Sequence, residues 1–290
     1  MTALTTIRAL RAASAACLIF AINQGIPVVL AQTKAISANV PAALSYADYA
    51  DIATLAPLVA KAQITNAIAL SASQSTGVPT GFRRLYVEAH VIGLIRGDNG
   101  IPPSVSYLYD VPLDARGKVP KLKKRQVLLL ARAGAQPGQI QLVTRDGQLD
   151  WTPAGESAVR AILSETLGAN TPPRIIGVGD AFHVAGTIAG EGETQIFLKT
   201  DTGQPVSLSI VRRPGEQPRW AVALGEIVDE AAATPQRGTL LWYRLACALP
   251  AALPAISVRT LAVSDAEAAR SDYAVVLAGL GPCGRTRAAG

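Results

Sequence analysis

Acidic and imidazole side chains gather in one short segment, GVGDAFHVAGTIAGEGET, which covers residues 177–194. Asp180 and His183 lie near the start of an expected strand, and Glu191 and Glu193 lie in the turn after it. A hairpin would bring these groups together, where they could hold a divalent ion or transfer protons. The spacing matches no named metal motif, and Gly-Glu-Gly-Glu is also typical of a polar turn. We therefore interpret the segment as a surface turn and keep an acid–base or metal-assisted site as the alternative.

A second group of charged residues fills residues 116–125, where six of the ten positions are basic. Its candidate binding residues are Lys118, Lys121, Lys123, Lys124 and Arg125. A loop of this composition concentrates positive potential and could contact anionic lipid, an anionic polysaccharide or the acidic patch of a protein. The alternative, which we favour, is a solvated connector whose lysines protect the edge of the apolar strand that follows.

Other catalytic chemistry has few candidates in this sequence. Only His90 and His183 can supply an imidazole, and His90 alternates with Glu88 on the polar side of an expected strand. No G-x-S-x-G elbow presents a serine nucleophile. The glycine-rich start of the 177–194 segment has Phe182 where a dinucleotide-binding fingerprint needs its third glycine. We therefore expect no cofactor, and the sequence leans against an enzyme.

The N-terminal residues have the three parts of a secretory signal in the usual order. Arg8 and Arg11 supply the positive charge, and residues 12–22 form an unbroken apolar run. Small residues then precede a cleavage point after Ala31, which predicts a signal peptide over residues 1–31. A membrane anchor is the alternative, but this run is far shorter than the roughly 20 apolar residues that span a bilayer. We therefore expect a periplasmic or secreted protein.

Export also bears on the cysteines. Cys17 falls in the apolar run of the signal peptide, so cleavage leaves Cys247 and Cys283. An even pair of cysteines in an exported chain favours a disulfide, because the compartment is oxidising. Cys247 falls in the last turn of one expected helix, and Cys283 lies just past another. A bond between them would pin the two helix ends together.

Composition narrows the class of protein further. Hydrophobic residues make up 49% of the chain and charged residues 17%, which excludes a disordered protein because enough apolar surface is present to form a core. A net charge of only +6 and 5% aromatic residues argue against a nucleic-acid partner, which would need a row of stacking side chains. No second apolar run reaches the length of a bilayer span, so we expect no transmembrane segment in the mature chain. The abundance of arginine and alanine fits a bacterial source.

Hydrophobic periodicity divides the chain after the signal into two domains, residues 32–169 and 174–290. The first domain has a helix at each end, capped by Ser45 and Thr152. Between the helices, apolar and polar residues alternate in five expected strands, near residues 58–65, 84–95, 105–111, 126–131 and 139–142. Gly93 interrupts the second of these strands, which predicts a bulge or a barrel corner.

The second domain continues the alternation in shorter strands and then changes to helical spacing. The expected strands lie near residues 182–188, 196–198, 206–210 and 220–224, a pattern that predicts an antiparallel meander. Thr234 begins an expected helix that Pro250 ends. Ser264 and Glu267 are spaced as a capping box for a last helix, which ends at Gly281.

Three stretches of the first domain, APLVAKAQITNA, RRLYVEAHVIGLIRG and KKRQVLLLARAG, follow one another between residues 56 and 145. Their order and spacing resemble the strands of exported domains related to tissue inhibitors of metalloproteases and netrins. The resemblance implies a five-stranded, partly closed barrel of the oligonucleotide/oligosaccharide-binding type. It does not imply metalloprotease inhibition, which relies on an N-terminal cysteine, because the mature chain would begin with Gln32. An antiparallel sandwich is the alternative architecture, and the second domain resembles no named family.

These observations predict a mainly β protein of the α+β class, with a five-stranded barrel or sandwich followed by a meander and two helices. The function that fits best is an exported, non-enzymatic binding or envelope-accessory protein. Its expected partner is an anionic envelope polymer, a lipid surface or another protein. Two alternatives stay open: an envelope hydrolase that uses Asp180, His183, Glu191 and Glu193, and a purely structural member of an envelope complex.

Overall fold

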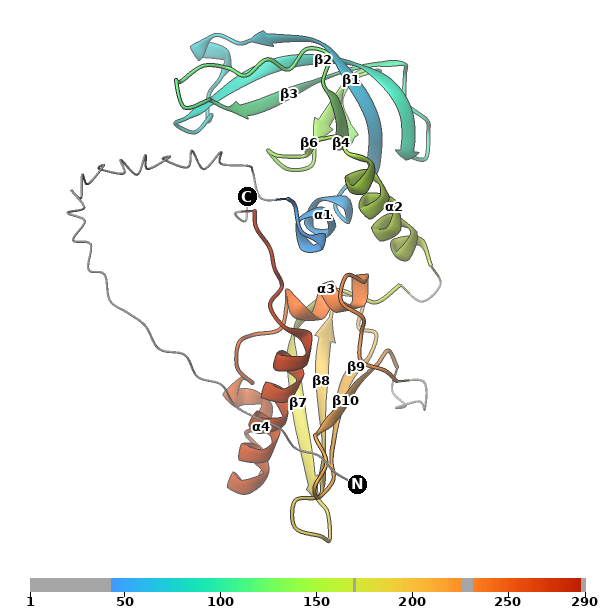
Figure 1. Cartoon of the computed structure of the whole chain (residues 1–290), viewed down its shortest axis with the longest axis vertical. Coiled ribbons are helices and arrows are strands. Elements are labelled where there is room, and N and C mark those ends of the chain that lie inside the picture. Colours follow the sequence, from blue (N-terminus) through green and yellow to red (C-terminus); the bar gives the residue numbers. More distant parts are fainter. Residues whose placement is uncertain (1–42, 169–170, 226–231, 288–290) are drawn as a thin grey trace, which may run out of the picture. The chain divides into compact units, whose positions relative to one another are not determined.

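The computed structural model describes residues 43–168, 171–225 and 232–287, and these ranges contain two antiparallel sheets and four α-helices (Figure 1). The mainly β, α+β class that the sequence predicts is confirmed. The predicted signal peptide, residues 1–31, lies outside the described residues. None of the described helices is long and apolar enough to cross a membrane. The division into two domains near residues 170–173 stays a prediction.

The first described helix is α1 (Tyr46–Ala53), and a reciprocal capping box fixes its start. The Ser45 hydroxyl accepts a hydrogen bond from the Asp48 backbone N–H at 3.2 Å. In return, the Asp48 carboxylate accepts one from the Ser45 backbone N–H at 2.8 Å. Fully buried Ala50 and Ile52 hold the helix in an apolar cluster shared with the first sheet. The predicted cap at Ser45 is thus confirmed.

The first sheet forms a nearly closed barrel. Its strands in chain order are β1 (Leu58–Ala69), β2 (Phe82–Arg96), β3 (Ser104–Pro112), β4 (Gln126–Ala133), β5 (Ile140–Leu142) and β6 (Gln148–Asp150). Their spatial order is β3-β2-β1-β4-β5, and β6 pairs with β4. The two ends of this order meet where the Ser106 N–H donates to the Gly138 carbonyl at 2.8 Å. The barrel is therefore confirmed, and one short strand, β6, adds to the five that the sequence predicts.

Strand β4 is buried on both faces, as its unbroken apolar run predicts. Val127 and Leu129 belong to the barrel interior, whereas Leu128 and Leu130 pack with the helices outside. Two faces of one strand therefore carry two separate apolar clusters. This arrangement anchors the helices to the barrel.

Helix α2 (Pro153–Leu167) supplies part of the cover outside β4. It begins as predicted, because the Thr152 side chain accepts a hydrogen bond from a backbone N–H of the first turn at 2.9 Å. The expected bulge is also present, since the register between β1 and β2 shifts beside Gly93. Both local predictions from the sequence are confirmed.

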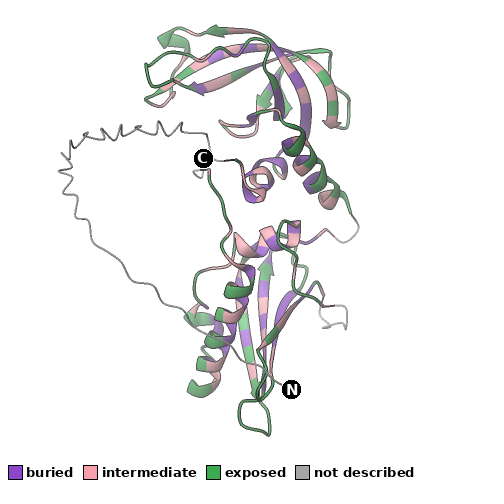
Figure 2. Ribbon diagram, viewed as in Figure 1, coloured by how far each residue is buried: buried purple, intermediate pink, exposed green. Residues whose placement is uncertain are grey.

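The second sheet is an antiparallel meander. It consists of β7 (Ile175–Ala185), β8 (Gly192–Thr200), β9 (Val206–Arg212) and β10 (Arg219–Ala223), in spatial order β10-β9-β8-β7. Helix α4 (Val263–Leu280) packs on one face, where the buried side chains of helix and sheet share one cluster (Figure 2). β7 begins at Ile175 rather than near residue 182, because Gly177 and Gly179 conceal its alternation from the sequence.

The helices of this part differ from the prediction at their starts. α3 (Leu240–Ala246) begins late and is short, and Thr239 caps it by accepting a hydrogen bond from a first-turn N–H at 3.3 Å. α4 begins after Ala262 and has no side-chain cap. The capping box predicted at Ser264 and Glu267 is therefore wrong, because Ser264 already lies inside the first helical turn.

The predicted disulfide between Cys247 and Cys283 is confirmed, with the two Cα atoms 4.8 Å apart. Cys247 directly follows α3, and Cys283 follows the end of α4. The bond therefore joins two helix ends, as the sequence predicts.

Polar contacts from α2 fix the position of α3. The Glu165 carboxylate accepts hydrogen bonds from the Tyr46 hydroxyl at 3.2 Å and from the Leu240 backbone N–H at 2.7 Å. One side chain of α2 thereby connects the starts of α1 and α3. These elements belong to one compact unit, residues 42–290.

Candidate functional site

His183 lies on β7 and contacts helix α4 instead of the carboxylates predicted beside it. Its Nδ1 atom is 2.8 Å from the Thr194 hydroxyl on β8 and 3.9 Å from Asp272 Oδ2 on α4. Thr194 also hydrogen-bonds to Asp272, which is fully buried and forms an ion pair with Arg212 of β9. One buried carboxylate therefore connects three strands to α4, and the network holds the helix on the sheet.

The three predicted carboxylates do not join His183. Glu193 precedes Thr194 along β8, so strand alternation places its side chain on the opposite face of the sheet. Asp180 and Glu191 are both exposed. Across the described ranges, no three acidic, histidine or cysteine side chains lie where they could hold a metal ion. The arrangement therefore gives no support to an acid–base or metal site in this segment.

The turn between β7 and β8, residues 186–191, has the geometry of an ordinary hairpin connection. The Gly186 N–H donates to the Glu191 carbonyl at 2.9 Å, and the Glu191 N–H donates to the Ile188 carbonyl at 3.0 Å. Gly190 has a φ of +86°, a left-handed conformation that glycine adopts without strain. The interpretation of this segment as a polar surface turn is confirmed.

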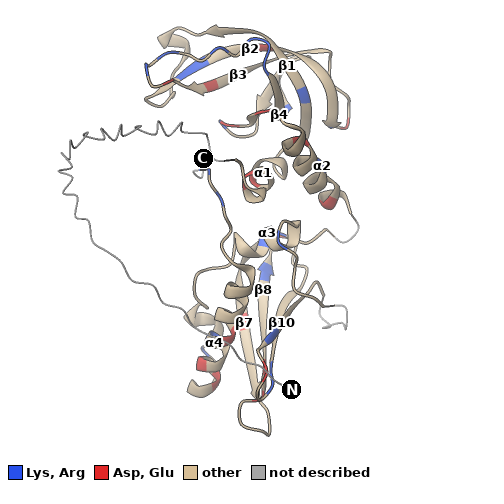
Figure 3. Cartoon of the chain, viewed as in Figure 1, with Lys and Arg blue, Asp and Glu red and all other residues tan. Residues whose placement is uncertain are grey.

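The basic loop, residues 116–125, connects β3 to β4 on the barrel (Figure 3). Its centre is fixed, because Leu122 is buried in the barrel core and the Lys124 N–H donates to the Ile64 carbonyl at 2.8 Å. The exposed residues of the loop include Lys118, Lys121, Lys123, Lys124 and Arg125. A rigid attachment thus presents the positive charges to solvent.

The expectation that these lysines protect a strand edge is wrong. β4 pairs with β1 on one side and with β5 and β6 on the other, so it is an interior strand. An interior strand has no free edge that a neighbouring charge could guard. The loop is thus a solvated connector without an edge to protect, and its contact with an anionic partner stays a prediction.

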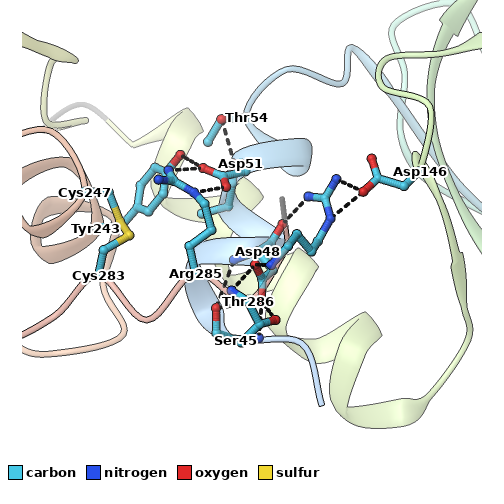
Figure 4. Close-up of polar contacts among 12 residues, drawn as sticks. Ser45, Asp48, Asp51, Thr54, Asp146, Tyr243, Cys247, Cys283, Arg285 and Thr286 are labelled. Carbon is cyan, nitrogen blue, oxygen red and sulfur yellow. Dashed lines mark hydrogen bonds and ion pairs between the residues drawn. A yellow bond between two sulfur atoms is a disulfide. The ribbon is translucent and has the colours of Figure 1, made fainter. Parts of the chain in front are cut away.

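Residues 283–287, which we call the C-terminal strap, lie against α1 (Figure 4). The Asp48 carboxylate accepts hydrogen bonds from the Thr286 N–H at 2.9 Å, the Thr286 hydroxyl at 2.6 Å and the Arg287 N–H at 3.0 Å. Burial opposes the ionisation of this acid. The hydrogen bonds from Thr286, Arg287 and Ser45 outweigh burial and lower the pKa of Asp48 to about 2. Asp48 therefore holds both the start of α1 and the strap.

Two further aspartates hold the arginines of the strap. Asp51 accepts hydrogen bonds from Arg285 at 2.5 and 2.7 Å and from the Tyr243 hydroxyl at 2.6 Å. Burial and this hydrogen bond to Asp51 raise the pKa of Tyr243 to about 12. Arg287 Nε donates to Asp146, in the turn before β6, at 2.7 Å. Both strap arginines are therefore neutralised by carboxylates.

A pocket of about 580 Å³ opens beside the strap. Its charged lining consists of five arginines and one carboxylate: Arg96, Arg174, Arg244, Arg285, Arg287 and Asp51. Its hydroxyl groups come from Thr54, Thr144, Thr166, Thr171 and Tyr243. The lining therefore combines a strong excess of positive charge with several neutral hydrogen-bonding groups.

Three of the pocket arginines, Arg96, Arg174 and Arg244, have no carboxylate oxygen within 4.0 Å in the described part of the chain. We call them the arginine trio. Burial lowers the pKa of Arg244, the negative charge of Asp201 opposes this shift, and the positive charge of Arg174 adds to it. The trio therefore carries charge that the described residues do not neutralise.

Separate elements bring the arginine trio to the pocket. Arg96 ends β2, Arg174 precedes β7, and Arg244 lies on α3. The Arg174 backbone N–H donates to Asp201 Oδ1 at 3.0 Å, which fixes the start of β7. No local motif joins residues this far apart in the chain, so spacing along the sequence does not reveal the pocket. The one local signal was the pair of arginines just after Cys283.

A larger groove of about 690 Å³ lies on the barrel beside β3 and β5. Its arginine charges are already paired, because Arg84 makes two hydrogen bonds to Asp110, at 2.7 and 2.9 Å. Arg145 lies 3.8 Å from the same carboxylate. The smaller pocket is therefore the better candidate, since unpaired charge marks a site for a charged ligand better than volume does.

A scan against models of known protein families finds no match, and a search of curated proteins finds no similar sequence. The resemblance of the first domain to the metalloprotease-inhibitor and netrin barrels therefore stays a prediction, although the barrel architecture itself is confirmed. The function of the protein has to be inferred from the geometry of the pocket.

Proposed function

We propose that this protein is an exported, non-enzymatic binding protein that holds a small anionic ligand in the arginine-lined pocket. The observation that carries the proposal is the arginine trio, Arg96, Arg174 and Arg244, which lines one pocket and forms no ion pair with any carboxylate of the described residues. Guanidinium groups that share a partly dehydrated space repel one another, and an anion between them relieves that repulsion. An anionic ligand would therefore supply the charge that the described chain does not.

The lining also indicates the chemistry of the ligand. Guanidinium groups present paired donors that match the oxygens of phosphate, sulfate and carboxylate groups. The threonine hydroxyls can hydrogen-bond to neutral polar atoms of the same ligand. The pocket volume falls within the usual range of small-molecule sites. A small organic phosphate or polycarboxylate fits these features better than a long polymer.

Binding fits this pocket better than catalysis. Asp51 is the carboxylate of the lining, and both of its oxygens are already engaged by hydrogen bonds from Arg285 and Tyr243. Cys247 also lines the pocket, but its sulfur is bonded to Cys283 and cannot act as a nucleophile. The features of the lining therefore favour ligand capture.

Export is supported by two independent features. The N-terminal sequence has the charge, apolar run and cleavage point of a signal peptide. The Cys247–Cys283 disulfide is the kind of bond that persists in an oxidising compartment. A binding protein outside the cytoplasm would meet phosphorylated and carboxylated metabolites that enter the cell envelope.

Titration calorimetry tests the proposal with three probes: inorganic phosphate, pyrophosphate and citrate. We expect at least one probe to bind, with an affinity that falls as salt is added. Arg174→Gln and Arg244→Gln should each weaken binding roughly 10- to 100-fold, the effect of losing a hydrogen bond between charged groups. The matched control is Arg259→Gln, because Arg259 is exposed and lies outside the pocket lining. Absence of binding to all three probes would refute the proposal.

A further inference from the structure

The C-terminal strap contributes Arg285 and Arg287 to the pocket, and Cys247, the disulfide partner of the strap, also lines it. We propose that the strap is a coupled part of the ligand site, so that a small oxyanion binds only while the strap is docked on α1. Bound oxyanion would in turn hold the strap in place. This inference rests on the proposed function and adds how that site is assembled.

The contacts of the strap show what docking depends on. Across the described structure, the hydrogen bonds of residues 285–287 go to α1 and to Asp146, and none goes to α4, from which the strap extends. The Asp48 carboxylate accepts three of these bonds, and the Asp48 backbone carbonyl accepts a fourth. The strap is therefore held by α1 and Asp146, which are distant from it in the sequence. It could lose these contacts while α4 stays in place.

Docking changes the charge that a ligand meets. With the strap in place, Arg285 neutralises Asp51 and Arg287 neutralises Asp146, so the arginine trio dominates the pocket. Without the strap, two arginines would leave and these carboxylates would be free. The trio would then face Asp51 in the same pocket, and Asp51 would take the place of an anionic ligand. An oxyanion would therefore be attracted less strongly, because the charged lining would fall from five arginines and one carboxylate to three arginines and one carboxylate.

The disulfide limits how far the strap can move. The chain before it is fixed at the end of α4, because the Leu280 carbonyl accepts hydrogen bonds from Trp242 Nε1 at 2.9 Å and Arg237 Nη2 at 3.3 Å. With Cys283 bonded to Cys247, only Gly284 separates this second anchor from Arg285. A tether this short keeps the strap at a high effective concentration beside α1. The disulfide thus favours the docked state although it makes none of the hydrogen bonds to α1.

Coupling between docking and binding is reciprocal, because any ligand that prefers the docked state must stabilise it by the same factor. Two measurements can therefore test one proposal. The first is the affinity for inorganic pyrophosphate, by titration calorimetry. The second is the hydrogen-exchange rate of the Thr286 and Arg287 amides, which both donate to Asp48 in the docked state.

Two variants of the full chain loosen the strap without removing a pocket arginine. Asp48→Asn weakens the hydrogen bonds that Thr286 and Arg287 donate, and Asp48 itself lies outside the lining. The double variant Cys247→Ser/Cys283→Ser removes the tether. Glu267→Gln is the matched control, because Glu267 is exposed on α4. Circular dichroism would show that each variant keeps its sheets and helices.

We expect pyrophosphate to slow exchange of the strap amides in the wild-type protein. Both loosened variants should exchange faster and bind pyrophosphate about tenfold more weakly, a usual size for coupling between two sites. The control should match the wild type in both measurements. Wild-type affinity in a variant whose strap amides exchange freely would overturn the coupling and leave the proposed function intact. Failure of the wild-type protein to bind pyrophosphate, phosphate or citrate would refute the proposed function itself, and the coupling with it.

Discussion

At the scale of single residues, Asp48 combines two roles that are usually separate. It completes the capping box of α1 with Ser45, and it accepts hydrogen bonds from Thr286 and Arg287 of the strap. A capping box alone needs one carboxylate oxygen. Here both oxygens are occupied, so this one acid links the first described helix to the last described residues.

The lowered pKa of Asp48 predicts how stability depends on pH. Its pKa falls from 3.8 to about 2 on folding, so the ionised form contributes roughly 2 kcal/mol of stability above about pH 4. This contribution is lost as the pH falls from about 4 through 2. Asp48→Asn should therefore be less stable than the wild type near neutral pH, and the difference should narrow below pH 4. Urea unfolding at a series of pH values measures the difference in stability between the two proteins. A difference that does not change with pH would contradict the lowered pKa of Asp48.

A second buried acid, Asp272, should be more costly to replace. It is fully buried between Thr194 and Arg212, and His183 lies 3.9 Å away. Asp272→Asn would leave Arg212 without its counter-charge, so we expect a loss of roughly 2–4 kcal/mol in the free energy of unfolding. Glu267→Gln on the same helix is the control and should change stability by no more than about 0.5 kcal/mol. Equal unfolding free energies for the two variants would show that the network does not hold α4.

At the scale of elements, the sequence predicts well the strands, caps and bulges that depend on residues close together in the chain. The five barrel strands, the cap at Ser45 and the bulge beside Gly93 all follow from local alternation or a single side chain. The same local signals fail where glycines interrupt a strand, as at Gly177 and Gly179 in β7, or where a helix starts without a side-chain cap, as α4 does at Ala262.

The candidate site could not be predicted from such local sequence patterns. His183 finds its partner in Asp272, on a helix that follows three more strands, and not in the acids beside it in the sequence. The arginine trio comes from a barrel strand, the start of β7 and α3. Spacing along a chain indicates a site only when one or two adjacent elements form it, and this pocket is formed by at least four.

The basic loop is an element whose role can be tested directly. Replacing Lys121, Lys123 and Lys124 with glutamine should weaken binding to phosphatidylglycerol vesicles roughly 100-fold, since each lysine near an anionic surface contributes about 1 kcal/mol. The loop should keep its shape, because Leu122 and the backbone of Lys124 anchor it. Vesicle sedimentation at several salt concentrations measures the effect, and the remaining binding should depend less on salt.

Lys199→Gln is the matched control for this experiment, because Lys199 is an exposed lysine on β8. Binding to the same vesicles that is unchanged in the triple variant at low salt would show that the basic loop does not contact anionic lipid. Binding that is weak to vesicles but strong to an anionic polysaccharide would assign the loop to the envelope polymer.

At the scale of the whole molecule, two separate regions gather basic residues, the basic loop with six and the arginine pocket with five. Removal of residues 1–31 would take away Arg8 and Arg11 but no acidic residue, so the mature protein stays cationic. Two separate cationic regions suit a protein that is held near an anionic surface while it binds a small anion. The basic loop and the pocket are separate regions, since no residue of the loop lines the pocket.

Mass spectrometry of the protein from the periplasmic or culture fraction tests its export. We expect a mature N-terminus at or near Gln32, because the signal sequence places the cleavage after Ala31. A peptide map without reductant should contain Cys247 and Cys283 as one linked pair. An intact Met1 in a membrane-bound product, or two free thiols, would contradict the assignment.

The long reach of the strap also sets an order for folding. The bond from Thr286 to Asp48 joins residues 238 positions apart, whereas the strands of each sheet pair mostly with their neighbours in the chain. Contacts that close large loops form late, because the chain must lose more entropy before they form. Both sheets can therefore be complete while the pocket still lacks one wall. A sample in which both sheets are fully formed can therefore still contain molecules whose proposed binding site is incomplete.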